Sequence, residues 1–220
     1  MTNVTKSYDR QAENYDEFIK KLVPDYEVFQ NLLPNFIGAA AKVLDIGCGT
    51  GNTALKLRQQ NPSLQLTCLD TSPQMLEIAR NKLGNQHNYV ETSIEKFDPQ
   101  EQFDAITSVM VMHNIQTTAD RLGAYRKIYG ALKPGGQYLS VDIFKGESDR
   151  LQDVYMMLWR QFMLQSLPES EIDEKWLPLH REKDKPLKLF DQIEILNKTG
   201  FKTVDIAHKR FQFAMLIAQK

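Results

Sequence analysis

An acid and three glycines at the end of an apolar segment are the residues whose types and spacing most clearly suggest chemistry. The segment VLDIGCGTGNTALKL spans residues 43–57, with the acid at Asp45. The glycines follow at every second position, at Gly47, Gly49 and Gly51. Glycine lets the backbone approach a ligand closely, and a helix beginning here leaves free N–H groups facing that ligand. Asp70 ends the next apolar segment, where a carboxylate can accept both hydroxyls of a ribose. These residues predict a nucleoside-containing ligand.

The charge of Asp45 and the spacing of the glycines indicate which nucleoside fits. A dinucleotide site uses the pattern GxGxxG, but this loop reads GCGTG and has Asn52 where the last glycine would stand. The Asp45 carboxylate would repel a pyrophosphate, whereas it suits a cationic amino group. S-adenosylmethionine has an ammonium, a sulfonium and a ribose but no phosphate, so these residues favour it over NAD. The alternative is a plain strand–helix turn with a capping acid.

Alternating apolar and amphipathic segments predict the elements that place these residues. Helices are expected at 51–60, 73–84, 122–132 and 188–199, with Ser72 as N-cap of the second. Strands are expected at 42–46, 64–69, 88–92, 103–109 and 137–144, with a turn at 133–136, and at 202–208 and 211–219. The fold class is therefore α/β: a Rossmann-like, doubly wound, seven-stranded sheet that is mostly parallel and closes with an antiparallel hairpin. Such sheets bind ligands at the carboxyl ends of their strands.

Four segments resemble, in order, the motifs of class I S-adenosylmethionine-dependent methyltransferases. They are VLDIGCGTG, LTCLDTSPQMLEIA, FDAITSVMVMHNI and ALKPGGQYL. The resemblance covers about residues 40–145, and the closing GFKTVDIAH…FQFAMLIAQ is similar to the family's last hairpin. It implies S-adenosylmethionine as cofactor, S-adenosylhomocysteine as product and a small-molecule methyl acceptor.

The resemblance also implies where the cofactor's parts lie. Around the methionine part it implies Asp45, Gly47 and Gly49, in a loop that also holds Cys48 and Gly51. It implies Asp70 at the ribose, and Thr71, Met75, Ser93 and Ile94 near the adenine. Ser93 stands where the family usually has an acid, although its hydroxyl can still accept a hydrogen bond from the adenine amine. Ser108 and Val109 should pass beneath the cofactor.

His113 follows the fourth predicted strand and is the candidate catalytic residue. Met110, Met112 and His113 are expected near the reacting methyl group, with Met112 on the substrate side. Histidine titrates near neutral pH and can act as a general base. Alternatively, His113 only packs or caps in its loop, because a thiolate or free amine acceptor needs no enzyme base.

Two helical regions are expected to cover the site within a single domain spanning residues 1–220. Residues 1–38 resemble the family's N-terminal lid, where Tyr8 and Tyr15 share one helical face and could close over the substrate. Residues 147–187 form an insertion with a nearly all-apolar first half and a charged second half, expected to be a mobile lid. Trp159 and Arg160 are its candidate substrate residues. The apolar helix could line a pocket, form a homodimer contact or simply be buried.

Composition and a second resemblance limit the functions considered. The net charge of −1 disfavours nucleic acid as a partner, and no run is apolar enough to predict a membrane span. Cys48 and Cys68 show no metal-binding spacing, so neither a metal nor a disulfide is expected and the protein is predicted to be cytoplasmic. The insertion and FQFAM also resemble carboxy-S-adenosylmethionine synthases, for which a serine would be expected directly after the cysteine, in a GCS-type loop, where this chain has GCGTG. A non-catalytic module that binds S-adenosylmethionine is a third hypothesis.

Overall fold

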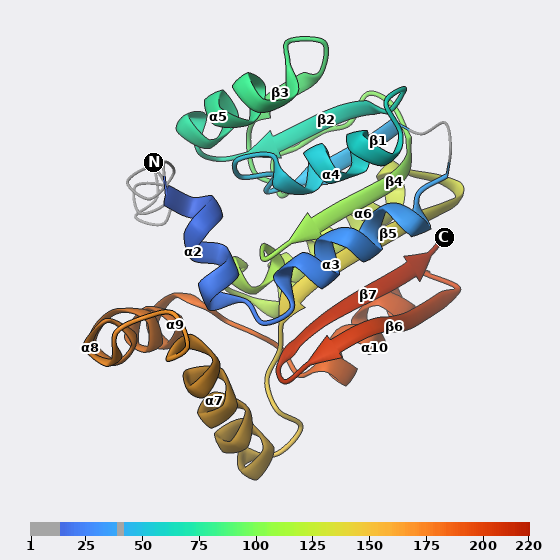
Figure 1. Cartoon of the computed structure of the whole chain (residues 1–220). Coiled ribbons are helices and arrows are strands. Elements are labelled where there is room, and N and C mark those ends of the chain that lie inside the picture. Colours follow the sequence, from blue (N-terminus) through green and yellow to red (C-terminus); the bar gives the residue numbers. More distant parts are fainter. Residues whose placement is uncertain (1–13, 39–41) are drawn as a thin grey trace.

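The computed structural model describes residues 14–38 and 42–220, and its centre is a seven-stranded sheet in the order β3-β2-β1-β4-β5-β7-β6 (Figure 1). The strands are β1 Lys42–Ile46, β2 Gln65–Asp70, β3 Asn88–Glu91, β4 Phe103–Val109, β5 Leu132–Ile143, β6 Thr203–Arg210 and β7 Phe213–Gln219. The first five pair in parallel, and β7 pairs antiparallel with both β5 and β6. The predicted α/β class and its closing antiparallel hairpin are confirmed.

The order of the strands determines where a ligand can bind. From β1 the chain builds outward through β2 and β3, then returns to place β4 and β5 on the other side of β1. This reversal opens a crevice beside the carboxyl ends of β1 and β4, the usual ligand site of such sheets. Asp45 lies in β1 opposite Thr107 of β4, and Asp70 is the last residue of β2. The two acids therefore stand at the same edge of the sheet.

Helices cover both faces of the sheet, and alternation along each strand divides the core between them. One face carries α2 Tyr15–Leu22, α3 Tyr26–Leu32, η2 Leu33–Phe36, α4 Asn52–Gln60 and α5 Pro73–Leu83 (Figure 1). The other carries α6 Thr118–Ala131 and α10 Leu189–Thr199. In β1, Val43 joins the first core and Leu44 the second, because successive strand residues point to opposite faces. The predicted N-cap is confirmed, since Ser72 Oγ accepts a hydrogen bond from the Met75 N–H at 3.1 Å.

The structure corrects one local prediction, the turn at 133–136. These residues belong to β5, which begins at Leu132 opposite Phe103 and resumes its pairing at Gln137 opposite Ala105. The four residues between them bulge out of the ladder, and Gly135 takes a φ of +77°. Pro134 and the glycines therefore interrupt the pairing without ending the strand.

The insertion forms a group of helices beside α2. It comprises α7 Asp149–Met163, α8 Glu169–Glu171, the π-helical turn η4 Ile172–Trp176 and α9 Leu177–Lys183 (Figure 1, lower left). The indole N–H of Trp159 donates to the Leu22 carbonyl at 2.6 Å and so joins α7 to α2. Trp159 and Met163 are the buried residues of α7, while Leu151, Val154 and Met157 are exposed.

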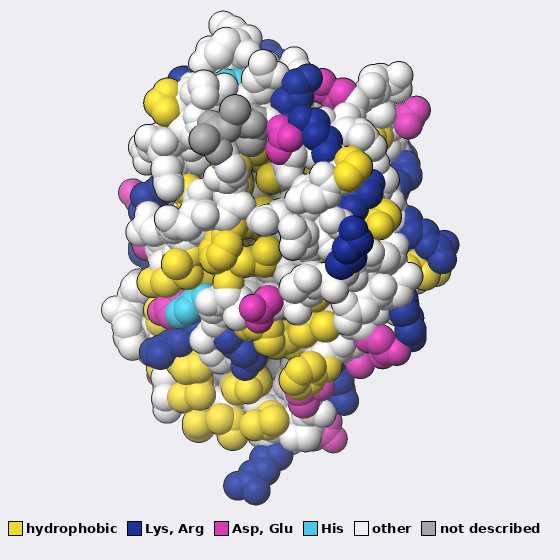
Figure 2. All heavy atoms as spheres, turned by 90° about the vertical axis from the view of Figure 1, so that its right-hand side faces the viewer, with side chains coloured by type: hydrophobic (Ala, Val, Ile, Leu, Met, Phe, Trp, Pro, Cys, Tyr) yellow, Lys and Arg dark blue, Asp and Glu magenta, His cyan; other side chains and the backbone are white. Residues whose placement is uncertain are grey.

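The exposed apolar side chains bear on the predicted dimer contact. Besides those of α7 they include Leu164 and Phe190, the latter 63% exposed. Hydrophobic side chains gather in the lower part of Figure 2, at the height of α7 and α10 in Figure 1, while Lys, Arg, Asp and Glu are intermixed above them. A homodimer through this surface stays a prediction. In the described parts of the chain, no helix is long and apolar enough to cross a membrane.

Candidate active site

The loop between β1 and α4 contains three glycines that all have a positive φ, but for different reasons. A Cβ on Gly47 would lie 2.5 Å from Cγ2 of Val111, and one on Gly51 would lie 3.1 Å from the Cβ of Ala79. Packing therefore requires both of these glycines. A Cβ on Gly49 would meet only Cε1 of Tyr15, at 3.9 Å. The space beside Gly49 is therefore open to a ligand. Its φ of +53° is a backbone conformation that residues with a side chain rarely adopt.

Asp45 is a buried carboxylate that lacks a partner for one oxygen. Its side chain is 1% exposed, and Oδ1 accepts a hydrogen bond from the Thr107 hydroxyl at 2.6 Å. No hydrogen-bond donor reaches Oδ2 from the described residues. Burial, opposed by the hydrogen bond from Thr107 and assisted by the nearby charge of Asp70, raises the pKa of Asp45 to about 7. A cationic ligand group beside Oδ2 would supply the missing partner and stabilise the ionised form.

Asp70 organises the same loop from the neighbouring strand. Its Oδ2 accepts from the backbone N–H of Gly49 and its Oδ1 from that of Ser72, both at 2.9 Å. These contacts fix the carboxylate at the end of β2, at the edge where a nucleoside ribose lies in sheets of this kind. The sequence pointed to Asp70 as a ribose ligand, and the structure adds that it holds Gly49 in position.

Two of the predicted cofactor residues direct their side chains into the core. Cys48 is buried, and burial with its close neighbour Cys68 raises the pKa of its thiol. The hydroxyl of Ser108 is 2.7 Å from that of Tyr138, inside the opposite core. Either residue would contact a cofactor at this edge through its backbone. Val109, the last residue of β4, is partly buried on the same face as Asp45.

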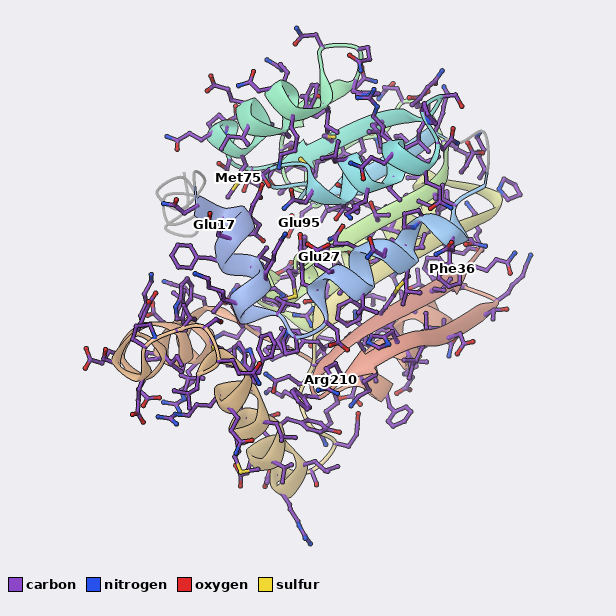
Figure 3. The ribbon with its side chains drawn as sticks, in the orientation of Figure 1. Glu17, Glu27, Phe36, Met75, Glu95 and Arg210 are labelled. Atoms are coloured by element: carbon purple, nitrogen blue, oxygen red, sulfur yellow. The ribbon has the colours of Figure 1, made fainter. Side chains whose placement is uncertain are left out.

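The residues predicted near the adenine lie around the ends of β2 and β3. The Thr92 N–H donates to the Asp70 carbonyl at 2.9 Å, which places Ser93 and Ile94 directly beside Asp70. Ile94 is buried and Ser93 is partly buried. Thr71 is exposed, whereas Met75 is buried and lies toward the side of the molecule on which α2 begins (Figure 3). Beside Asp70, the carboxyl edge of β2 and β3 thus has two hydroxyl side chains, Thr71 and Ser93, and two apolar ones, Met75 and Ile94.

A cavity of about 130 Å³ adjoins the glycine loop, and aromatic rings form much of its wall. Phe18 and Leu22 come from α2, Trp159 from α7, Trp176 and Leu179 from the rest of the insertion, and Phe213 from β7. Tyr15 lines the cavity and also lies beside Gly49, so it connects the two spaces. Met110 lines the cavity too, and its φ of +58° is unusual for a residue with a side chain. Strained backbone at the end of a strand is typical of functional sites.

His113 lies in η3 Met112–Asn114 at the polar end of this cavity. Its imidazole is 5% exposed, its Nδ1 is 2.5 Å from Asp142 Oδ1, and its backbone N–H donates to Asp142 Oδ2 at 3.1 Å. Burial would lower the pKa of His113, but the Asp142 carboxylate and then Asp184 outweigh it, so the pKa lies above its ordinary value. With Nδ1–H donated to Asp142, Nε2 is left as the basic atom.

The predicted substrate residues therefore separate into two groups. Tyr15 and Trp159 line the cavity together with His113. Met112 is fully buried in the core on the opposite face of the sheet, and Arg160 binds Asp173 and Glu169 at the surface, so the structure brings neither to the cavity. Tyr8 lies outside the described residues.

The sequence interpretation missed Asp16, which joins α2 to the cofactor loop. Asp16 accepts from Thr50 Oγ1 at 2.5 Å, Asn52 Nδ2 at 2.8 Å and Lys82 Nζ at 2.8 Å. Burial would raise the pKa of Asp16, but these three donors lower it below its usual value. No local pattern marks the residue, because its partners lie 34 to 66 positions away.

Three further polar residues were not predicted as site residues: His180 and Asp184, which line the cavity, and Asp142, which holds His113 from behind it. For Asp142 a signal existed, since the acid in SVDIF lies near the carboxyl end of a predicted strand. His180 and Asp184 belong to the charged half of the insertion, where a surface lid was expected. Their position becomes clear only in three dimensions.

Comparison with known proteins agrees with this geometry. Residues 44–138 match the family model of a methyltransferase domain. The chain is 25% identical to the carboxy-S-adenosyl-L-methionine synthase of Nautilia profundicola, over 95% of this chain and 92% of that protein. It is 27% identical to the demethylmenaquinone methyltransferase of Leptospira interrogans, over 97% of this chain and 87% of that protein.

The chain is similar to class I S-adenosylmethionine-dependent methyltransferases, and the matched methyltransferase domain model covers less than half of its length. The relatives and the solved structures support S-adenosylmethionine as the cofactor, in agreement with the unpaired oxygen of Asp45 and the open space at Gly49. The resemblance stated from the sequence motifs is confirmed.

Solved structures share the fold of this methyltransferase. The N-methyltransferase NodS of Bradyrhizobium japonicum, in complex with S-adenosyl-L-homocysteine, superposes with a TM-score of 0.70 over 100% of this chain and 99% of its own, at 18% identity. A putative O-methyltransferase of Nostoc punctiforme gives a TM-score of 0.71 at 18% identity, and the present chain spans 60% of its length.

Proposed function

We propose that this methyltransferase transfers the methyl group of S-adenosylmethionine to a small-molecule acceptor with a largely apolar body. The observation that carries the proposal is the His113–Asp142 pair at the polar end of a cavity with aromatic walls. Tyr15 lies at both that cavity and the glycine loop, so the two spaces meet where a methyl group would pass.

The cofactor would lie along the carboxyl edge of β1 and β2. Asp45 Oδ2 would accept from its ammonium, with Gly47 and Gly49 against the methionine part and Asp70 at the ribose. The adenine would rest among Thr71, Met75, Ser93 and Ile94, and the backbone at Cys48, Gly51, Ser108 and Val109 would complete the site. The cofactor supplies an activated methyl carbon, and this chain's residues orient it toward the cavity.

His113 would remove the acceptor's proton during transfer. Asp142 holds the imidazole with Nδ1–H directed toward its carboxylate, so the lone pair of Nε2 faces the acceptor. The acceptor atom loses its proton to Nε2 and bonds to the methyl carbon, while the electrons of the broken carbon–sulfur bond go to sulfur. The imidazolium that forms is stabilised by Asp142.

The rest of the chain would enclose this reaction within one domain. Residues 1–38 would cover the cofactor from one side, and residues 147–187 would form the wall that selects the acceptor. The described parts support these roles, because α2 is held to the glycine loop by Asp16 and to α7 by Trp159. Nucleic acid is not proposed as an acceptor.

Carboxy-S-adenosylmethionine synthesis is the second candidate, since a relative with that name is similar over nearly the whole chain. The cavity supports it less well. The basic residues that line it are His113, His180 and Lys183, and no described arginine is among them. An arginine would be the expected partner of a carboxylate substrate. The loop also reads GCGTG rather than a GCS sequence.

A turnover screen tests the proposal. The enzyme is incubated with S-adenosylmethionine and separate panels of phenols, amines, thiols and quinols, and with prephenate, and the products are identified by mass spectrometry. S-adenosylhomocysteine formed together with a methylated acceptor supports methyl transfer. Carboxylated S-adenosylmethionine formed with prephenate supports the second candidate. Tight S-adenosylhomocysteine binding with neither product would indicate a non-catalytic binding module.

A further inference from the structure

The end of the insertion is fixed against the loop that carries His113. The Lys185 N–H donates to the His113 carbonyl at 2.8 Å. Arg121 Nη2 donates to the Lys185 carbonyl at 2.7 Å and to the Ile115 carbonyl at 2.8 Å. These contacts join the η3 loop, α6 and the segment after α9, and they hold Asp184 beside the imidazole. The mobility expected of the charged half of the insertion stays a prediction.

Asp184 faces the atom of His113 that Asp142 leaves available. Its Oδ1 is 3.7 Å from His113 Nε2, and its Oδ2 is 2.7 Å from His180 Nδ1. The Asp184 side chain is 19% exposed, compared with 5% for His113, so it lies between the imidazole and solvent. The imidazole is thus placed between two carboxylates, one on the sheet and one from the insertion.

The neighbouring positive charges do not cancel this pair. Lys183 also lines the cavity, but its Nζ is 2.6 Å from Glu182 Oε1. Arg121 is buried and donates to backbone carbonyls, so its guanidinium keeps its charge and lowers the pKa of His113, but the two carboxylates outweigh this effect. His180 is the remaining titratable group, and it contacts Asp184. An acceptor entering beside Nε2 therefore meets a negative potential within a low-dielectric wall.

We propose that Asp184 is a positioning and selectivity residue that, with Asp142, holds His113 between two carboxylates, so that the cavity takes neutral or cationic aromatic acceptors and rejects carboxylates. This rests on the proposed role of His113 as the base. Proton transfer from the acceptor to Nε2 creates an imidazolium, which both carboxylates stabilise. An acceptor with a carboxylate near its reacting atom is repelled by the same charges.

The first test measures the titration of His113 without any turnover. Long-range ¹H–¹⁵N spectra of the full chain follow its four histidines with pH, assigned by His→Gln variants. In Asp184→Asn the midpoint of His113 should fall by about one pH unit, since a carboxylate within about 4 Å is lost. Glu174→Gln removes an exposed carboxylate of the insertion that does not line the cavity and should leave the midpoint nearly unchanged.

Asp184→Glu keeps the charge and should largely restore the midpoint, which separates electrostatics from damage to the fold. An unchanged midpoint in Asp184→Asn, or an equal shift in Glu174→Gln, would overturn the role of Asp184. Because this readout involves no acceptor, it succeeds or fails independently of the proposed methyl transfer.

The second test uses benzyl alcohol, benzylamine and benzoate as probes in the presence of S-adenosylhomocysteine. Binding is followed through the indole signals of Trp159 and Trp176, the two tryptophans of the chain. Benzoate should bind at least about fivefold more weakly than the other two, and Asp184→Asn should narrow that difference. Equal binding of all three, an unchanged difference in the variant, or no binding of any probe would overturn the acceptor class.

Discussion

The glycine loop and the insertion both contribute acids to the site, but they do so in different ways. The loop places Asp45 and Asp70 through short-range rules, because a strand, a turn and a helix N-terminus follow within about thirty residues. The insertion places Asp184 through contacts with His113 and Arg121, which are more than sixty positions away. The residues around the cofactor can therefore be predicted from the sequence, whereas the residues around the acceptor are brought together only by tertiary packing. Changes in one region should alter cofactor affinity, and changes in the other should alter turnover.

The largest expected effect comes from the cavity. His113→Gln should lower turnover by about a hundredfold or more, since a positioned general base contributes roughly 10²–10⁴. S-adenosylhomocysteine affinity measured by calorimetry should stay within about twofold, because the imidazole faces the cavity and Asp142. His87→Gln, a change at a partly buried histidine ahead of β3, is the control. Unchanged turnover in His113→Gln would reduce His113 to a structural residue.

The next largest effect should come from the cofactor edge. Asp70→Ala should weaken S-adenosylhomocysteine binding by more than about tenfold, since a hydrogen bond to a charged group is worth roughly 1.5–3 kcal/mol. The variant also removes the acceptor of the Gly49 N–H, so the loop itself should loosen. Glu77→Ala, on the exposed side of α5, serves as the matched control. Equal affinities in the two variants would show that the ribose lies elsewhere.

The raised pKa of Asp45 predicts how cofactor affinity depends on pH. Near pH 6 the carboxyl must lose a proton before it can pair with an ammonium, so S-adenosylhomocysteine affinity should rise roughly tenfold between about pH 6 and pH 8. Asp45→Asn should bind weakly with almost no pH dependence. An S-adenosylhomocysteine affinity of the wild-type protein that does not change with pH would contradict the ion pair between Asp45 and the ammonium group.

The same shift predicts a stability effect of opposite sign in the ligand-free protein. A carboxyl whose folded pKa is raised stabilises the fold below its unfolded pKa, and that stability is lost as pH rises through about 7. Asp45→Asn should therefore raise the melting temperature near pH 8 by roughly 2–8 °C and change it little near pH 5, since about 1–3 kcal/mol is recovered. Thermal denaturation at the two pH values gives the answer. A lower melting temperature of Asp45→Asn at both pH values would contradict the predicted direction of the stability change.

The smallest effect should come from the contact that joins the N-terminal helix to the loop. Asp16→Ala removes the shared acceptor of Thr50, Asn52 and Lys82 and should weaken S-adenosylhomocysteine binding by about threefold, because partly exposed polar contacts are worth about 1 kcal/mol or less. Amide exchange in α2 should become faster. Glu17→Ala changes the adjacent exposed acid on the same helix (Figure 3) and should do neither. An effect of equal size in both variants would remove the special role of Asp16.

The extent to which the sequence predicted this structure follows the same division. Strand and helix limits around the glycine loop lie within about two residues of the observed ones, because apolar periodicity and the Ser72-Pro73 cap are local signals. The prediction of a turn at 133–136 is wrong, because Gly and Pro are as typical of a β-bulge as of a chain reversal. For α7 the sequence does not distinguish between a pocket wall, a dimer contact and simple burial. The hydrogen bond from the Trp159 indole to Leu22 shows that Trp159 faces inward. Arg160 illustrates the limit, because its carboxylate partners turned out to be Asp173 and Glu169 of the chain itself.

The central claim is that one unpaired carboxylate oxygen and an open glycine loop select a cationic, phosphate-free nucleoside. Calorimetry of the unmodified protein with S-adenosylhomocysteine and with NAD, each up to about 1 mM, tests it directly. One S-adenosylhomocysteine should bind per chain in the micromolar range or tighter, with no measurable heat from NAD. Binding of NAD with equal or higher affinity, or no binding of S-adenosylhomocysteine, would contradict it.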